Sequence, residues 1–443
     1  MGNEKNTNSQ SRREFVKTSS IVAGGMLAMP FISRANYFSG SAGTIKIALI
    51  GCGGRGTGAA VQALRTKQNV ELVAMGDAFK DRLDSSYNNI KEALGENAKR
   101  LNVKEENKFV GFDAYKKAIP LADVVILATP PGFRSYHFEE AVNQGKQIFM
   151  EKPVATDPAG IQRVLKAAEI AKAKKLNVVV GLQRHYQNSY RELYKRVQDG
   201  MIGDILSGQV YWNQGALWMR PRKPEYTEME YQMRNWYYFN WVCGDHIVEQ
   251  HIHNLDVMNW FTGKHPVKTV GSGGRAVRTG KEYGEIFDHH CLEYAYDDGV
   301  LMNSQCRHWK DAASKVDEQI IGTKGKVFCD AGRITDSKGK VLYQFDKKKE
   351  NNPYQTEHDE LFAAIAKGEY KFHDAERGAQ ATLTAIIGRL ATYSGQIIDW
   401  NTALNSGLDI MPKEFNFNAQ PPVMPDGEGY YAHAIPGKTK YFV

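Results

Sequence analysis

Between residues 44 and 184, short apolar runs alternate with longer segments whose apolar positions recur at helical spacing. The runs are nearly continuous, which is typical of parallel strands buried on both faces. We predict strands at 45–50, 70–75, 107–110, 123–128, 147–150 and 177–182. Helices are predicted at 56–66, 80–95, 113–118, 134–144 and 158–174. This alternation predicts an α/β domain built on a doubly wound parallel sheet.

Beyond about residue 185, apolar and polar positions alternate and aromatic residues become frequent. A period of two predicts an antiparallel or mixed sheet with one covered face. Its strands are predicted at 205–212, 287–296, 299–306, 318–322 and 326–328. Helices are predicted at 189–199, 245–261, 356–366 and 376–393, before an irregular tail. We therefore divide the folded part of the chain into domains at 44–184 and 185–443.

The first 35 residues follow neither pattern. The motif S-R-R-E-F-V-K at 11–17 precedes a weakly apolar run at 21–32, an arrangement typical of a twin-arginine export signal. That run is too short to cross a bilayer stably, and no later segment of the sequence is long and apolar enough. We predict a signal peptide at 1–35, a linker at 36–43 and export to the periplasm, without stable membrane insertion.

Composition excludes several classes of function. With 42% apolar and 24% charged residues, the 443-residue chain resembles an ordinary globular protein. The formal net charge is +7, but no basic run is interleaved with aromatic residues, so we predict no nucleic-acid partner. The five cysteines form no C-x-x-C pair, which argues against a disulfide framework and a thiolate zinc site.

A G-x-G-x-x-G motif stands between the first predicted strand and the first predicted helix. In such a loop the first glycine makes the tight turn, the second admits a pyrophosphate, and the third lets helix and strand pack closely. The helix N-terminus then presents unpaired N–H groups to the phosphates. We predict that this loop binds a dinucleotide through Gly51, Gly53, Gly54, Arg55 and Gly56.

Asp77 ends the second predicted strand, where a carboxylate can bind a ribose hydroxyl. A carboxylate repels a 2′-phosphate, so Asp77 favours NAD over NADP, although Lys80 and Arg82 nearby weaken that preference. Thr129 and Pro130 follow the predicted strand at 123–128 and reach the carboxyl edge of the sheet, where ligands bind in such folds. We assign both to the cofactor site.

The tripeptide Glu151-Lys152-Pro153 follows the predicted strand at 147–150, so Lys152 lies at the same edge. A partly desolvated lysine beside an oxidised nicotinamide has a lowered pKa, and it could exchange a proton with a substrate hydroxyl. The alternative is a surface lysine paired with Glu151. We assign Glu151 and Lys152 to the cofactor site, and Lys152 to catalysis as well.

The segment 244–256, interpreted as one helix, gathers His246, Glu249, His253 and Asp256 on one side. Glu249 and His253 are four residues apart, and a carboxylate beside an imidazole suits acid–base chemistry near neutral pH. Two alternatives remain open: a solvated face, and a metal site formed by His246, Glu249 and His253. We predict acid–base work by His253 and Glu249, and no metal.

Together the glycine loop, Ala128-Thr129-Pro130, Glu151-Lys152-Pro153 and His253-x-x-Asp256 resemble the glucose–fructose oxidoreductase/inositol dehydrogenase (Gfo/Idh/MocA) family over about 44–400. The resemblance implies a Rossmann domain, a C-terminal α/β domain with an open, largely antiparallel sheet, and homodimers or homotetramers. It implies NAD or NADP and a carbohydrate or cyclitol substrate. It also implies that Lys152 contacts the reacting oxygen and that His253 is the acid–base. Glu249 stands where the family normally has Asp.

Four residues are predicted to contact substrate. Arg184 and Tyr186 match the family's hinge into the sugar pocket, although they could instead only secure the domain junction. Asp256 closes the helix motif. Trp236 belongs to an aromatic group that could stack on a sugar, or could be core.

These assignments predict an exported nicotinamide-dependent oxidoreductase acting on a carbohydrate or cyclitol hydroxyl. No pool of NAD exists outside the cytoplasm, so we expect the cofactor to be tightly held. One alternative is an NAD-dependent glycoside hydrolase or lyase that oxidises the sugar transiently, eliminates and then reduces. Another is an exported, non-catalytic sugar-binding protein.

Overall fold

The computed structural model describes residues 43–442, so the predicted export signal at 1–35 and nearly all of the linker at 36–43 lie outside the described residues. The first half of the fold is a six-stranded sheet of order β3-β2-β1-β4-β5-β6 in which every neighbouring pair is parallel. Its strands are β1 Ile45–Ile50, β2 Val70–Asp77, β3 Lys108–Val110, β4 Val124–Leu127, β5 Gln147–Met150 and β6 Val178–Val180. The predicted doubly wound sheet is confirmed.

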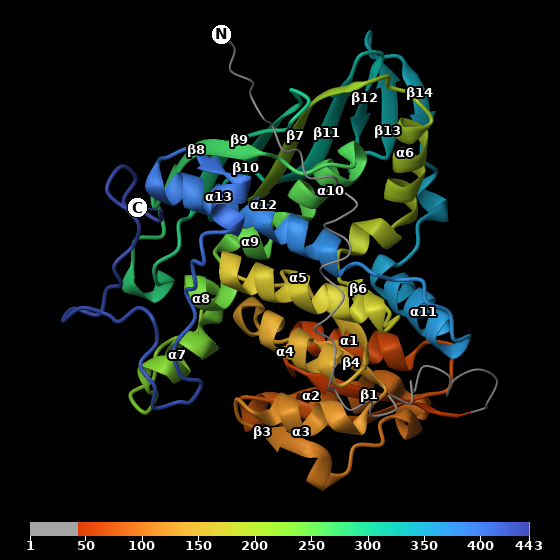
Figure 1. Ribbon diagram of the computed structural model, residues 1–443, viewed down its shortest axis with the longest axis vertical. Coiled ribbons are helices and arrows are strands. Elements are labelled where there is room, and N and C mark those ends of the chain that lie inside the picture. Colours follow the sequence, from red (N-terminus) through yellow and green to blue (C-terminus); the bar gives the residue numbers. More distant parts are fainter. Residues whose placement is uncertain (1–42, 443) are drawn as a thin grey trace, which may run out of the picture. The chain divides into compact units, whose positions relative to one another are not determined.

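Helices connect these strands and bury their apolar stripes on the sheet (Figure 1). Helix α5 begins sharply because the Asp157 carboxylate accepts the Gly160 N–H at 2.7 Å, and Pro158 occupies the first turn. The five helices are α1 Gly54–Leu64, α2 Lys80–Leu94, α3 Ala114–Ala118, α4 Pro131–Asn143 and α5 Pro158–Ala173.

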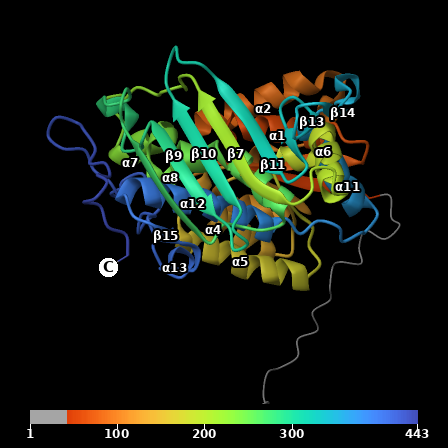
Figure 2. The same cartoon turned by 90° about the horizontal axis from the view of Figure 1, so that it is seen from above.

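The second half is built on a nine-stranded sheet of order β14-β13-β12-β11-β7-β10-β9-β8-β15 (Figure 2). Only β7 and β10 pair in parallel, and the other neighbours are antiparallel. Buried and exposed positions alternate along β9 and β10, as expected when one face is covered. The strands are β7 Ile205–Gln214, β8 Lys268–Gly274, β9 His289–Ala295, β10 Leu301–His308, β11 Lys315–Gly322, β12 Gly325–Phe328, β13 Arg333–Asp336, β14 Val341–Gln344 and β15 Ile398–Asp399.

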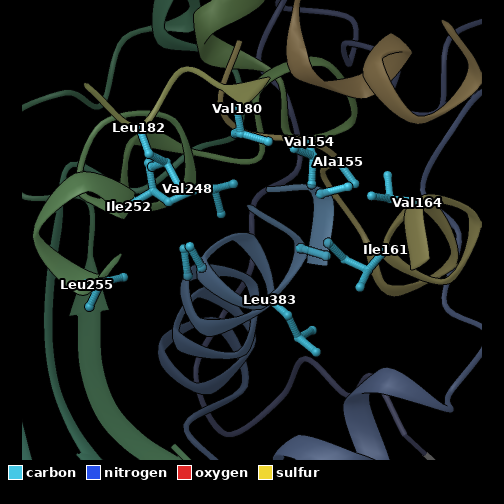
Figure 3. Close-up of a cluster of buried hydrophobic side chains, with 14 of the residues drawn as sticks. Val154, Ala155, Ile161, Val164, Val180, Leu182, Val248, Ile252, Leu255 and Leu383 are labelled. Atoms are coloured by element: carbon cyan, nitrogen blue, oxygen red, sulfur yellow. The ribbon is translucent and has the colours of Figure 1, made fainter. Parts of the chain in front are cut away.

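Helix α12, Ala375–Ser394, is buried along almost its whole length between this sheet and helix α5 (Figure 1). Leu383 of α12 shares an apolar cluster with Val154 and Ile161 from the first half, and with Val248 and Ile252 from the second (Figure 3). Both halves of the fold therefore share one hydrophobic core. The remaining helices are α6 Asn188–Gln198, α7 Glu228–Arg234, α8 Asn240–Cys243, α9 His246–Glu249, α10 Ile252–Thr262, α11 Pro353–Ala366 and α13 Trp400–Leu404.

Helix α11 lies on the first half, although it follows the nine-stranded sheet in sequence. Leu361 and Phe362 join the cluster that contains Ile47 of β1 and Ala59 and Ala60 of α1. The dinucleotide-binding half is thus completed by a segment about 180 residues after the predicted boundary at 184.

The predicted helix at 245–261 is wrong in one respect, because it is broken into α9 and α10. The His251 N–H bonds to the His246 carbonyl, and the His253 N–H bonds to the Gln250 carbonyl at 3.4 Å. The first bond spans five residues and the second spans three, so the four-residue spacing of α-helical hydrogen bonds is interrupted here. The alternative of a solvated face is excluded, since His246, Glu249, His253 and Asp256 are all buried.

Within residues 43–442, no helix combines the length and the apolar character needed to cross a bilayer.

Candidate active site

A cavity of about 690 Å³ opens at the carboxyl edge of the parallel sheet. One side is formed by the glycine loop and the ends of β2, β4 and β5, and the other by the segments around β7, α7 and α9. Most of the predicted site residues line it: Gly51, Gly53, Gly54, Arg55, Asp77, Thr129, Pro130, Glu151, Lys152, Trp236, Glu249 and His253. Gly56, Arg184, Tyr186 and Asp256 do not.

Each glycine of the motif has a distinct steric role. Gly51 has a φ of +95°, and a Cβ there would lie 2.3 Å from the Thr129 nitrogen. A Cβ on Gly56 would lie 1.9 Å from the Gly51 carbonyl oxygen, so this glycine lets α1 approach the strand. A Cβ on Gly53 would meet nothing within 4 Å, so only a ligand would need that space. The loop fits a dinucleotide pyrophosphate.

Asp77 organises this loop and also faces the cavity. Its carboxylate accepts the Cys52 N–H at 2.6 Å and the Phe79 N–H at 2.9 Å. Burial raises the pKa of Asp77, while these two backbone donors oppose the shift. Arg82 lines the same region of the cavity. The carboxylate is therefore well placed to accept ribose hydroxyls.

Two cofactor-side residues, Arg134 and His137, were missed by the sequence analysis. Arg134 donates to the Thr129 carbonyl at 2.5 Å, but its Nε and Nη1 find no acceptor among the described residues. Burial lowers the pKa of Arg134 to about 10. The His137 ring lies 3.2 Å from the Thr129 hydroxyl, and burial together with Arg134 lowers its pKa to about 3. Their signal was their position on the predicted helix, where Arg134 lies about one turn and His137 about two turns beyond Pro130.

Lys152 is paired with Glu249 and not with Glu151, so the surface-lysine alternative is wrong. Its ammonium donates to the Glu249 backbone carbonyl and, at 2.9 Å, to the Glu249 carboxylate. Glu151 instead pairs with Arg55 at 2.6 Å. The Lys152 and Glu249 side chains are only 12% and 11% exposed, so the pair is largely shielded from water. Burial raises the pKa of Glu249 even though Lys152 opposes the shift.

His253 lies on the Trp212 ring, with 5.8 Å between ring centroids. Burial, and then the positive charge of Lys152, hold its pKa well below the usual range, so the imidazole is neutral at pH 7. The predicted orientation of His253 by Glu249 is wrong. Glu249 Oε2 and His253 Nδ1 both lack hydrogen-bond partners within residues 43–442, because the helix break directs Glu249 toward Lys152.

The predicted substrate residues divide into two groups. Trp236 lines the cavity, next to Trp218 at 5.6 Å. The other three make buried contacts elsewhere: Arg184 pairs with Glu318, Tyr186 donates to Asp374, and Asp256 bonds to His185 at 2.8 Å. Arg184 and Tyr186 thus secure the junction between the halves, which was the alternative for them. His246, from the predicted polar face, lies against His290 and His308.

The alternative metal set of His246, Glu249 and His253 does not converge. Among the described residues, the one group whose ligand atoms lie close together is Asp245, His246 and His290.

Both halves of the chain match a known protein family. The family described as "Oxidoreductase family, NAD-binding Rossmann fold" matches residues 45–181. The family described as "GFO/IDH/MocA C-terminal domain" matches residues 190–328. Inositol 2-dehydrogenase from Rhizobium meliloti (strain 1021) is 24% identical over 335 residues, covering 73% of this chain and 90% of that protein. The 2,7-anhydro-N-acetylneuraminate hydratase from Escherichia coli (strain K12) is 26% identical over 212 residues, 47% of this chain and 52% of that protein.

Among solved structures, scyllo-inositol dehydrogenase from Lactobacillus casei, with bound NAD(H) and scyllo-inositol, superimposes with a TM-score of 0.61. It is 23% identical and covers 81% of this chain and 100% of its own. The two family matches together span more than half of the chain. With the glycine loop and Asp77 shaped for the cofactor, the conclusion is direct: this chain belongs to the Gfo/Idh/MocA family and is an NAD-binding oxidoreductase.

Proposed function

We propose that this chain oxidises a secondary hydroxyl of a carbohydrate or cyclitol, with Lys152 and His253 handling the proton. The observation that carries the proposal is the placement of both side chains on the cavity that the glycine loop also lines. NAD, when bound there, accepts the hydride from the carbon that becomes the ketone.

The charges of Lys152 and His253 fit complementary tasks. Two N–H groups of the Lys152 ammonium donate to Glu249, and the third has no acceptor among the described residues. That third donor can bind the reacting oxygen and stabilise the negative charge that develops on it. Neutral His253 can accept the hydroxyl proton, which an imidazolium could not do.

Aromatic side chains on the second half favour a carbohydrate or cyclitol. Trp212, Trp218, Trp236 and Tyr237 line the cavity, together with Arg220. Flat aromatic faces suit the C–H faces of such rings, and polar groups at the edge bind their hydroxyls. The inositol dehydrogenases among the similar proteins support the same substrate class.

Tight retention of NAD is supported by a C-terminal strap, which we define as residues 410–423. Phe417 of the strap lies 5.3 Å from Phe79 and 4.9 Å from Phe112, and both of these rings line the cofactor side of the cavity. Arg234 spans the same region, bonding to Asp81 at 3.1 Å and lying 4.0 Å over the Phe79 ring. We propose that these contacts slow the escape of NAD.

We further propose export through the predicted twin-arginine signal, and assembly into a dimer or tetramer through the outer face of the nine-stranded sheet. Val270 and Leu301 are exposed on that face. Deleting residues 1–35 should keep the protein in the cytoplasmic fraction. Analytical ultracentrifugation of the mature protein should show more than one chain per particle, and a monomer would reject the assembly.

A redox-neutral reaction is the second candidate, and the hydratase relative favours it. In this candidate the sugar is oxidised to a ketone, the carbon beside the ketone loses a proton and the next carbon loses its substituent, water adds to that carbon, and the ketone is reduced again, as in an NAD-dependent glycoside hydrolase or lyase. Retained NAD would suit such a cycle, because the cofactor returns to its starting state.

One experiment tests the main proposal. The full-length protein is purified gently, the nucleotide released by acid is identified by mass spectrometry, and inositols and aldoses are then added to the loaded protein. We expect stoichiometric NAD and a rise in reduced-nicotinamide absorbance with at least one substrate. Cleavage of a glycoside with no net change in absorbance would instead select the redox-neutral candidate. Loaded protein that reacts with none of these compounds would overturn both.

A further inference from the structure

A second cluster of chemically active side chains lies behind the wall of the cavity. It contains Asp245, just before α9, His246, the first residue of α9, and His290 in β9. Their exposed fractions are 0%, 0% and 2%. None of the three lines the cavity, so the reaction proposed above does not use them.

The ligand atoms of this cluster lie at separations suited to one ion. His246 Nδ1 is 2.8 Å from Asp245 Oδ1, and His290 Nε2 is 3.3 Å from Asp245 Oδ2. All three ligand atoms fall within 4.8 Å of one another. Neighbouring ligands of a tetrahedral ion with bonds of about 2.0–2.1 Å lie about 3.3 Å apart. The His290 contact already has this separation, the His246 contact would need to open by about half an ångström, and the two imidazoles would need to lie at a similar distance from each other.

Of the four imidazole nitrogens of His246 and His290, one bonds outside the cluster: His290 Nδ1 lies 2.8 Å from the Thr392 hydroxyl. Both nitrogens of His246 and Nε2 of His290 lack a hydrogen bond of good geometry within residues 43–442. Both nitrogens of His308 are also buried without partners, and its ring lies 4.4 Å from the His246 ring. Buried polar atoms are nearly always satisfied, so several orphaned nitrogens around one carboxylate indicate a missing partner.

The contrast with His251 strengthens this reading. His251 is equally buried on the same segment, yet its Nε2 lies 2.7 Å from the Ser304 hydroxyl and its Nδ1 lies 3.3 Å from the Asn254 side chain. Both nitrogens of His251 therefore have protein partners, whereas neither nitrogen of His246 has one of good geometry within residues 43–442.

We propose that Asp245, His246 and His290 bind one divalent transition-metal ion, with Zn²⁺ the ion best matched to imidazole and carboxylate donors. The site is structural, since none of its ligands faces the cavity.

Such an ion would stabilise the segment that carries Glu249. Asp245 has a φ of +73°, which is unfavourable for a non-glycine residue. Its carboxylate already accepts the Phe287 N–H at 3.0 Å and the Tyr393 hydroxyl at 2.5 Å, and these bonds fix its orientation. A metal ion bound by both Asp245 and His290 would connect the start of α9 to β9. It would thereby hold Glu249, the last residue of α9, in position against Lys152.

The test is the metal content of the full-length protein, purified without chelators and measured by inductively coupled plasma mass spectrometry. We expect about one zinc per chain, and X-ray absorption at the zinc edge should report nitrogen and oxygen ligands only. H246Q and H290Q should each lose the metal, whereas the matched control H251Q should keep it. Circular dichroism establishes that each variant is folded.

Three results would overturn the proposal. The first is wild-type protein that holds no metal as purified and binds no added Zn²⁺ or Co²⁺. The second is sulfur in the ligand shell, which would point to the buried Cys243 or Cys306. The third is a folded H290Q protein with unchanged metal content. Because the readout is metal content and ligand type, failure of the proposed reaction would leave this test unaffected.

Discussion

The two walls of the cavity are built on different principles. On the cofactor wall the backbone does most of the shaping, through glycines that make room and through main-chain N–H groups at the start of α1. Where the two walls meet, charged side chains define the site: Lys152, just after β5, and Glu249, on the opposite wall, compensate each other's charge over 2.9 Å. Changes on the first wall should therefore act by excluding a ligand, and changes where the walls meet by altering charge.

The largest effect is expected from Lys152→Ala. It removes the donor to the reacting oxygen and leaves the Glu249 carboxylate buried without its cation. We expect kcat to fall by roughly 10²–10⁴-fold with the NAD content unchanged. Rapid mixing of loaded protein with substrate, followed by reduced-nicotinamide absorbance, measures this. Lys172→Ala, at an exposed position on α5, is the control. A Lys152→Ala protein that turns over normally would remove Lys152 from the mechanism.

Gly53→Ala should impair cofactor binding at the glycine loop without unfolding the protein. The added methyl meets no protein atom within 4 Å, so thermal stability should be unchanged, but it occupies the space needed by the pyrophosphate. We expect NAD binding to weaken by on the order of 100-fold, equivalent to about 2.7 kcal/mol, in a titration of cofactor-stripped protein. Gly427→Ala, which also meets nothing within 4 Å, is the matched control. Equal NAD affinity in both variants would mean that the phosphates lie elsewhere.

Acid should destabilise the cofactor wall through His137. Its folded-state pKa of about 3 lies below the ordinary 6.5, so between these values the unfolded chain binds a proton that the folded protein does not. Above pH 6.5, His137 therefore does not reduce the free energy of unfolding. Below pH 6.5, it lowers the free energy of unfolding by about 1.4 kcal/mol for each pH unit. His137→Gln should therefore show a smaller fall in unfolding free energy between pH 7 and pH 5, by about 2 kcal/mol.

The control for that measurement is His373→Gln, at an exposed position. It should reproduce the pH dependence of the wild-type protein in denaturant titrations. If His137→Gln does so too, His137 is protonated in the folded protein and its burial has no electrostatic cost.

The sequence predicts the cofactor wall better than the opposite wall, because local spacing along the chain determines the first and contacts between distant residues determine the second. Gly51, Asp77 and Lys152 follow apolar strands directly, and the carboxyl ends of parallel strands meet at one edge, so local spacing was enough to place them. The pairing of Lys152 with Glu249 joins positions 97 residues apart, which no local pattern contains. Glycine-rich β8 and the four-residue strands β13 and β14 carried too weak an alternation to be predicted.

The helix break at Gln250 and His251 shows the same limit more sharply. The prediction treated 245–261 as one continuous helix, and the four-residue spacing on such a helix placed Glu249 beside His253. The segment is instead buried on all sides, and its polar residues contact partners on β9, on β10 and at the end of β5. When every face of a segment is buried, the spacing of apolar residues no longer shows which face is turned to the core.

The smallest effect is expected at the strap, where neither wall is altered. Phe417→Ala removes two ring contacts, to Phe79 and Phe112, and aromatic pairs contribute about 0.5–1.5 kcal/mol beyond buried area. We expect NAD to dissociate about 3–10-fold faster, measured by chasing bound NAD with a labelled analogue. Tyr430→Ala, at an exposed position in the same tail, should leave the rate unchanged. If Phe417→Ala also leaves the rate unchanged, retention depends on the walls alone, and the slow escape of NAD must be sought in the glycine loop and Asp77.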